Sequence, residues 1–363
     1  MTQSLPQNDL PYWIALSHCP KIGPTRWSIL RRSFSTMKEV WEASANELKR
    51  TGLEEYIIVA LVDHRQKTNV TEKWEELAKL RIEVVNIIDE RYPKLLREIY
   101  DPPALLFYRG DINALNNNSL AVVGARQATS YGLRVAEEFV HTLAYAGLTI
   151  ISGLAYGIDA AAHRATLKAN GITVAVLASG LDQIYPTANQ ALANEMVKHG
   201  GLLLTEFPPH TAPLKQNFPY RNRVIAGLAR GTLVIEAAHG SGALITVKQA
   251  LEANREVFTV PGNIFSEYSK GTNELLKLGA HPVTEAQDIL NVYGLENTAK
   301  SEVLPLADEQ KTLLEYLSSE PLHIDELGRQ ARVPAAELTA QLTILELAGY
   351  VRDVGGHTYI KLT

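Results

Sequence analysis

Basic and aromatic residues gather in one stretch of an otherwise acidic chain. The formal net charge is −5 over 363 residues, yet no Asp or Glu occurs from Phe207 to Ile235. From Lys215 onward, the basic and aromatic residues of this stretch are Lys215, Phe218, Tyr220, Arg221, Arg223 and Arg230. A single-stranded nucleic acid needs cations along its backbone and rings that stack on its unpaired bases. Guanidinium groups add planar forks that suit phosphate. The stretch therefore favours single-stranded nucleic acid as its ligand.

A structural role for the same residues is the alternative interpretation. In that reading Phe218 and Tyr220 are core residues that cap a sheet edge, and Arg221 and Arg223 form ion pairs with Glu206 and Glu236. The sequence leaves this alternative open.

Turn glycines follow the predicted strands and indicate a ligand-binding edge. Those that we expect to let a phosphate approach the backbone are Gly124, Gly153, Gly157, Gly240 and Gly242, with Ser241 between the last two. Ligands of doubly wound sheets bind outside the carboxyl ends of the strands, where helix N-termini suit phosphate. The alternative is that the glycines only form tight turns. Because several successive loops open on the same edge, we favour a ligand site.

The first of these loops, "VVGARQATSYG", does not carry the G-x-G-x-x-G fingerprint of a dinucleotide site, and no acidic residue follows at the expected distance of about 20 residues. Arg126 and Thr129 instead stand between the glycine and the next predicted helix, which favours a phosphate group. A surface salt bridge is the alternative role for Arg126.

Catalysis and metal binding have weaker signals. Asp159 and His163 are four residues apart, so they share a helix face and form a candidate acid–base pair. A position near a helix N-terminus alone also explains Asp159. The histidines are scattered without ligand spacing such as H-E-x-x-H, so we expect no metal and no cofactor.

The elements that position these residues are predicted from apolar patterns. Nearly all-apolar runs alternate with helical runs over residues 81–292, which predicts an α/β domain with a doubly wound parallel sheet. Residues 1–80 are predicted to be helical, 293–304 to be a linker, and 305–363 to be a winged helix. The basic stretch lies between the fourth and fifth strands of the 118–291 segment, so its loop is expected at the ligand edge.

Composition limits the class of protein. The single cysteine, Cys19, allows no intramolecular disulfide, and no apolar run approaches the roughly 20 residues that a membrane helix needs. The first residues do not form a signal peptide pattern. We therefore expect a cytoplasmic protein without membrane contact.

Several long motifs resemble the DNA-processing protein A (DprA/Smf) family. They are "VVGARQATSYG", "ISGLAYGIDAAAH", "AVLASGLDQIYPTAN", "FPYRNRVIAGL", "IEAAHGSGALIT" and "VPGNI…GTNELLKLGA", in order across about residues 85–290. The N-terminal helices are similar to that family's sterile-alpha-motif-like (SAM-like) domain, and the tail to its winged helix. One departure is Ala125, where the family usually has Ser.

The resemblance implies an extended Rossmann-like core that binds single-stranded DNA without base specificity. It also implies a non-enzymatic homodimer that loads the RecA recombinase onto incoming DNA during natural transformation. By motif, the DNA contacts fall on Arg126, Lys215 and Phe218, with Arg221 and Arg223 alongside.

The alternative function is enzymatic. The core is distantly similar to the "lonely guy" phosphoribohydrolases, whose hallmark P-G-G-x-G-T-x-x-E supplies a catalytic glutamate. The corresponding stretch here is "HGSGALITVKQA", with Lys248 and Gln249 where an acid is needed. This difference argues against hydrolysis.

The C-terminal segment that is predicted to be a winged helix is acidic. From Glu302 to Thr363 there are five Lys/Arg and ten Asp/Glu, a net charge of −5, and the predicted reading helix "PAAELTAQLTILELAG" has no cation. A helix that reads the major groove normally needs Arg or Lys. We therefore expect a protein-contact or intramolecular role for the winged helix.

Overall fold

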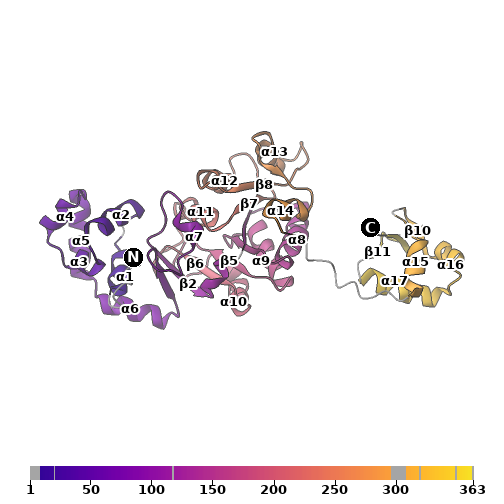
Figure 1. Ribbon diagram of the computed structural model, residues 1–363, viewed down its shortest axis with the longest axis horizontal. Helices are drawn as coiled ribbons and strands as arrows, with labels where there is room; N and C mark the ends of the chain where they lie inside the picture. The colour runs from indigo at the N-terminus through magenta and orange to yellow at the C-terminus, as the bar shows by residue number, and fades with distance from the viewer. Residues whose placement is uncertain are drawn as a thin grey trace. The chain divides into compact units, whose positions relative to one another are not determined.

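The computed structural model describes residues 9–19, 21–116, 118–295, 308–318, 320–347 and 350–361. The chain forms two compact units, Met1–Glu296 and Asn297–Thr363 (Figure 1). Most of the predicted linker, from residue 296 to residue 304, lies outside the described residues. Within the described ranges, no helix has both the length and the apolar character needed to cross a membrane.

Short helices build the first part of the larger unit. They are α1 (Leu10–Ser17), α2 (Pro24–Ser33), α3 (Met37–Glu42), α4 (Ala45–Arg50), α5 (Glu55–Lys67) and α6 (Val70–Lys79). Local sequence starts two of them, since the Thr36 side chain caps α3 and Ser44 forms a capping box with Glu47 at α4. Buried Trp13 stacks on Trp27 with ring centroids 5.2 Å apart. These contacts join the helices around a shared apolar core.

A nine-stranded sheet forms the centre of the larger unit. Its strands are β1 (Glu83–Asn86), β2 (Leu105–Gly110), β3 (Ser119–Val123), β4 (Thr149–Ser152), β5 (Thr173–Val176), β6 (Leu202–Thr205), β7 (Gly231–Val234), β8 (Glu256–Thr259) and β9 (His281–Pro282). Their order is β1-β2-β6-β5-β4-β3-β7-β8-β9, and only the pairings of β2 with β1 and with β6 are antiparallel. The predicted doubly wound, mostly parallel sheet is confirmed.

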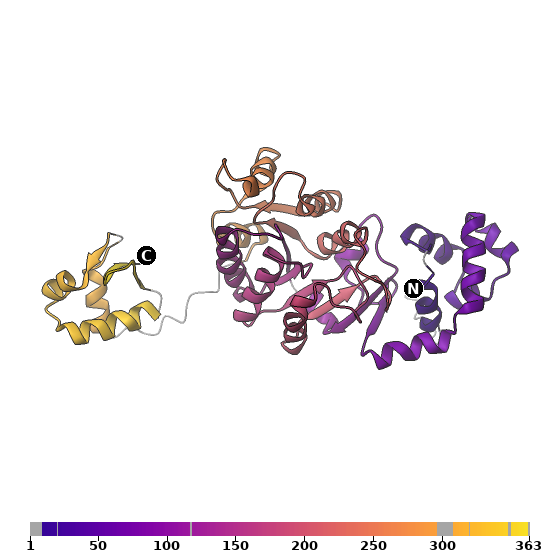
Figure 2. The same cartoon turned by 180° about the vertical axis from the view of Figure 1, so that it is seen from behind.

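Helices cover both faces of the sheet, because alternate side chains of each strand point to opposite sides. Leu120 and Val122 of β3 pack with α8 (Ser130–Tyr145), α9 (Ile158–Lys168) and α14 (Ala286–Tyr293). Ala121 and Val123 belong to the core that includes α11 (Asn217–Leu228) and α12 (Gly242–Glu252). Figures 1 and 2 show the sheet between these two groups of helices. The remaining helices of this unit are α7 (Lys94–Arg97), η1 (Ile112–Asn116), η2 (Thr187–Asn189), α10 (Gln190–Lys198), η3 (Glu267–Ser269) and α13 (Lys270–Lys277).

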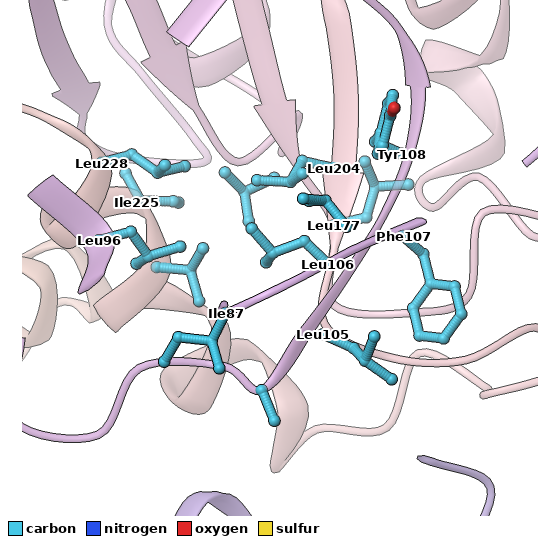
Figure 3. Close-up of a cluster of buried hydrophobic side chains, with 14 of the residues drawn as sticks. Ile87, Leu96, Leu105, Leu106, Phe107, Tyr108, Leu177, Leu204, Ile225 and Leu228 are labelled. Atoms are coloured by element: carbon cyan, nitrogen blue, oxygen red, sulfur yellow. The ribbon is translucent and has the colours of Figure 1, made fainter. Parts of the chain in front are cut away.

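The part of the basic stretch that carries Phe218, Tyr220, Arg221 and Arg223 is a helix, which corrects the expectation of a loop. α11 begins at Asn217, and Pro219 lies in its first turn, where the missing N–H costs no hydrogen bond. Its second half is fully apolar and buried, from Val224 to Leu228. Figure 3 shows Ile225 and Leu228 in a cluster with Leu96 and residues of β2. This core contact holds the first turn of α11 in a fixed place.

The smaller unit is a winged helix. Its elements are α15 (Asp308–Glu315), β10 (Leu322–His323), α16 (Ile324–Ala331), α17 (Ala335–Leu347), β11 (Val351–Asp353) and β12 (Thr358–Lys361). The strands form a sheet in the order β10-β12-β11. Leucines from the three helices, with Val351 and Tyr359 from the wing, form its core. The winged helix predicted from the pattern of the tail is confirmed.

Candidate nucleic-acid interface

A groove opens where the strand order of the sheet reverses. β3 neighbours both β4 and β7, so successive connections leave this point in opposite directions, and a crevice forms outside the strand ends. The groove has a volume of about 850 Å³. Of the predicted site residues, it brings together Gly124, Arg126, Lys215, Phe218, Arg221, Ser241 and Gly242. We call this cavity the main groove.

The exposed part of the main groove combines cations with rings. The Arg126 guanidinium carbon lies 5.1 Å from the centroid of the Phe218 ring. The Tyr185 ring meets Phe218 edge-on, with centroids 5.7 Å apart. Phe218 is half-buried and both Arg126 and Lys215 are exposed. Neither cation has an acidic partner in the ranges that the structure describes, so both charges remain available to a ligand.

Arg221 forms the floor of the groove. Its guanidinium group is buried and is not exposed for binding a phosphate. Only 4% of the Arg221 surface is exposed. Its Nη1 donates to the Gly153 carbonyl at 2.9 Å and to the Val176 carbonyl. A Cβ on residue 153 would lie 2.6 Å from Arg221 Nη2, so only glycine allows this approach. Burial lowers the pKa of Arg221 to about 10, which still leaves the side chain charged at neutral pH.

Asp159 is the charge that faces Arg221. Its carboxylate is buried and accepts the N–H groups of Gly153 at 3.1 Å and Ala155 at 3.4 Å. Burial raises the pKa of Asp159, and the nearby guanidinium of Arg221 opposes that rise. Together the two side chains fix the loop that follows β4. Both side chains therefore hold the groove in its shape. For Arg221 this structural role replaces the phosphate contact that the sequence suggested.

Arg223 lies outside the main groove, so the structure removes it from the predicted contact set. It is 6% exposed and forms ion pairs with Glu206 and with Asp101, the latter at 3.3 Å. Its guanidinium carbon lies 4.3 Å from the Tyr220 ring centroid. Burial raises the pKa of Glu206 to about 7, and Arg223 opposes that rise. The alternative of a structural ion pair to Glu206 is therefore what the structure shows for Arg223.

Thr129 is also committed to the fold. Its hydroxyl accepts the Gly132 N–H at 3.1 Å and donates to Glu236, whose carboxylate also accepts the Thr129 N–H at 2.9 Å. An internal carboxylate thus already occupies the N-terminus of α8, where its charge is stabilised. Within the described ranges neither Arg221 nor Arg223 forms an ion pair with Glu236, while Arg223 pairs with Glu206. The predicted phosphate contact at Thr129 is corrected for this reason.

The N-terminus of α12 faces the main groove instead. Ser241 caps this helix by accepting the Ala243 N–H at 3.3 Å, and the first turn contains no acidic residue. Gly240 precedes it with a φ of +72°. Free N–H groups at a helix start attract anions. Of the predicted phosphate-approach loops, that of Gly240, Ser241 and Gly242 is therefore open to a ligand.

No acid–base pair forms between Asp159 and His163 in the described part of the chain. His163 is fully buried, its Nδ1 lies 2.7 Å from the Thr173 hydroxyl, and burial lowers its pKa to about 3. Among the residues that the structure describes, no group of three His, Cys, Asp or Glu side chains has the arrangement of a metal site.

The sequence analysis missed Tyr185, Gln127 and Asn222, which line the main groove. Tyr185 follows β5 in the run "QIYPTAN", so an aromatic residue in a strand-end loop was the signal that pointed to it. Asn222 is four residues after Phe218 on α11 and shares its helix face.

Family models, curated relatives and two solved structures match this chain to one protein family. Residues 83–294 match the family model for DNA recombination-mediator protein A, and residues 297–357 match the DprA winged helix domain. The chain is 42% identical over 283 residues to Protein Smf of Escherichia coli strain K12, which covers 75% of each chain. The crystal structure of DNA processing protein A from Streptococcus pneumoniae has a TM-score of 0.69 and 35% identity, and covers 79% of this chain and 98% of that one.

A second similar solved structure belongs to a protein that was studied for its binding of single-stranded DNA. It is DNA processing protein A from Helicobacter pylori, reported for its single-stranded DNA binding mode, with a TM-score of 0.54 and 29% identity. The match covers 60% of this chain and 98% of that chain.

Proposed function

The chain belongs to the DNA recombination-mediator protein A family, and from this premise we propose that it binds single-stranded DNA in the main groove without base specificity. The observation that carries the proposal is that Arg126 and Lys215, which have no acidic partner in the described ranges, line the same groove as the half-buried Phe218 ring. Cations hold the sugar–phosphate chain and the ring takes an unstacked base, a contact that any base can make. The similarity to the Helicobacter pylori protein supports the same ligand.

Each part of the groove has a role in this proposal. Lys215 and Arg126 neutralise phosphates, and the open N-terminus of α12 accepts a third at Ser241 and Gly242. Phe218 stacks on a base, while the Tyr185 ring at its edge and the Arg126 guanidinium fix its orientation. A duplex offers no free base face to Phe218, so single strands are preferred.

We further propose that the protein is a non-enzymatic homodimer that loads a RecA-type recombinase onto the bound strand during natural transformation. The family supports this role, and the groove supports the absence of catalysis. Asp159 is the one carboxylate among the described residues that line the main groove, and two backbone N–H groups hold it. On α12, Lys248 pairs with Glu252 and Gln249 donates to the Pro219 carbonyl, so neither replaces a catalytic glutamate.

The winged helix is assigned a protein-contact or intramolecular role. Its α17 has no Lys or Arg, and Arg329 on α16 is already paired with Glu326. A reading helix needs free cations for the DNA major groove.

Binding is tested by fluorescence anisotropy with single-stranded and duplex oligonucleotides over a range of salt concentrations. The double variant Lys215→Glu/Phe218→Ala is expected to lose single-strand binding and keep its melting temperature. The matched control is Lys198→Glu/Tyr145→Ala, which makes the same changes in the last turns of α10 and α8, at the opposite edge of the sheet. Near wild-type affinity in the first double variant would refute the proposal.

Recombinase loading and catalysis have separate assays. The wild-type protein is expected to stimulate RecA filament formation on DNA coated with single-strand-binding protein, and the first double variant is not. Incubation with nucleoside monophosphates is expected to release no free base. Release of base would favour the phosphoribohydrolase alternative.

A further inference from the structure

A second hollow adjoins the main groove beyond Arg126. It has a volume of about 620 Å³ and shares Arg126 and Gln127 with the main groove, so the two cavities are neighbours. Its other walls come from the loop before α9, with Tyr156 and Gly157, and from α9 itself, with Arg164. We call this cavity the Tyr156 hollow.

The Tyr156 hollow repeats the chemistry of the main groove. Half of the Tyr156 surface, 50%, is exposed, which leaves its ring open to a ligand. No Asp or Glu is among the described residues that line the hollow, and both of its guanidinium groups are exposed. An exposed ring beside cations is the pattern by which proteins hold an unpaired base and its phosphate.

Arg164 has no acidic partner within the described residues, although acids lie on the neighbouring helix. Two acids of α8 are already paired, Glu138 with Arg134 and Glu137 with Lys168, the latter across to α9. These pairs leave Arg164 as an uncompensated positive charge at the hollow. Buried Arg223, by contrast, is paired with Glu206 and lies over the Tyr220 ring.

Backbone contacts fix the position of the Tyr156 hollow relative to the main groove. Gly157 has a φ of +72°, and a Cβ at this position would lie 2.2 Å from the Ala125 carbonyl oxygen. The Ile158 N–H donates to the same oxygen at 3.2 Å. The start of α9 therefore packs directly against the loop that carries Arg126, which sets Tyr156 and Arg126 in a defined relation.

We propose that the Tyr156 hollow is a second subsite for the same single strand. A base stacks on Tyr156, a phosphate binds Arg164, and Arg126 contacts the strand where it passes between the two cavities. This inference rests on the proposed function and extends it, since it gives the direction in which the strand leaves the main groove.

The test compares two lengths of oligothymidylate, about 6 and about 20 nucleotides, because single-strand sites span roughly 4–16 nucleotides. Tyr156→Ala is expected to weaken binding of the longer oligomer about fivefold, the lower end of the cost of a lost base stack. Binding of the shorter oligomer, which the main groove holds, stays within about twofold of wild type. Tyr145→Ala, at the far end of α8, is the matched control and leaves both affinities unchanged.

Salt dependence tests Arg164. Arg164→Gln is expected to reduce the magnitude of the slope of log affinity against log salt for the longer oligomer by about 0.7, the share of one phosphate on a single strand. Lys198→Gln, an exposed cation at the opposite edge, is expected to leave the slope unchanged. A longer oligomer substituted with bromodeoxyuridine is expected to crosslink to the peptide that contains Tyr156.

The outcomes separate this inference from the proposed function. Unchanged affinity for the longer oligomer in Tyr156→Ala, or equal losses with both lengths or in the control variants, overturns the second subsite. If Lys215→Glu/Phe218→Ala abolishes binding in the same series, the main groove still stands as the DNA site. If that double variant binds like wild type, the proposed function fails, whatever the Tyr156 variant does.

Discussion

Replacement of Arg221 by alanine is expected to destabilise the fold, because this buried cation supports the groove from below. The change would leave the Gly153 and Val176 carbonyls without their donor and the buried Asp159 carboxylate without its nearest positive charge. Removing one member of a buried ionic network costs about 3–5 kcal/mol of unfolding free energy. At about 2–4 °C per kcal/mol, the melting temperature should fall by roughly 6–20 °C.

The comparison with Arg126→Ala makes this prediction specific. Arg126 is exposed and has no ion pair in the described ranges, so its loss should change stability by no more than about 0.5 kcal/mol. Its loss should weaken single-strand binding, which Arg221→Ala affects only through the shape of the loops. Melting curves of both variants measure the loss of stability, and fluorescence anisotropy measures the loss of single-strand binding. An Arg221→Ala variant that melts like wild type but binds no DNA would show that the guanidinium reaches the ligand.

Three further changes test the structural assignments. Thr129→Ala removes the cap of α8 and its bond to Glu236, so stability measured by urea titration should fall by about 1 kcal/mol while single-strand affinity is retained. His163 is buried with its pKa lowered to about 3, so stability should fall as pH drops from about 6.5 towards 3, and His163→Gln should reduce this loss, which is about 1.4 kcal/mol per pH unit. Gly157→Ala places a Cβ against the Ala125 carbonyl, and anisotropy should show weaker single-strand binding, because the loop that bears Arg126, the proposed DNA contact, must shift.

The sheet and the groove at its strand ends could be predicted from sequence because their signals are local. Apolar runs fully buried on both faces are a property of each strand alone, and β3, β4 and β7 lie where the runs predicted them. Glycine loops follow those strands directly. That Arg126, Lys215 and Phe218 line one groove could be predicted for the same reason, since loop position and residue type needed no knowledge of distant contacts.

The buried cations could not be assigned in this way, because their partners are remote in sequence. Arg223 pairs with Glu206, 17 residues earlier, and donates to the carbonyl of Asp101, 122 residues earlier. Thr129 meets Glu236 across 107 residues. Charge and spacing alone do not tell whether an arginine points to a ligand or to such a carboxylate.

Helical periodicity would have separated the two arginines of α11. Residues two apart on an α-helix point about 200° away from each other, whereas residues three or four apart share a face. Phe218, Asn222 and Ile225 therefore line the main groove, with Arg221 on the same stripe. Tyr220 and Arg223, three apart, line a different hollow of about 510 Å³. The expectation of a loop allowed all the cations of the stretch to face one ligand, whereas the helix divides Arg221 and Arg223 between the main groove and the other hollow.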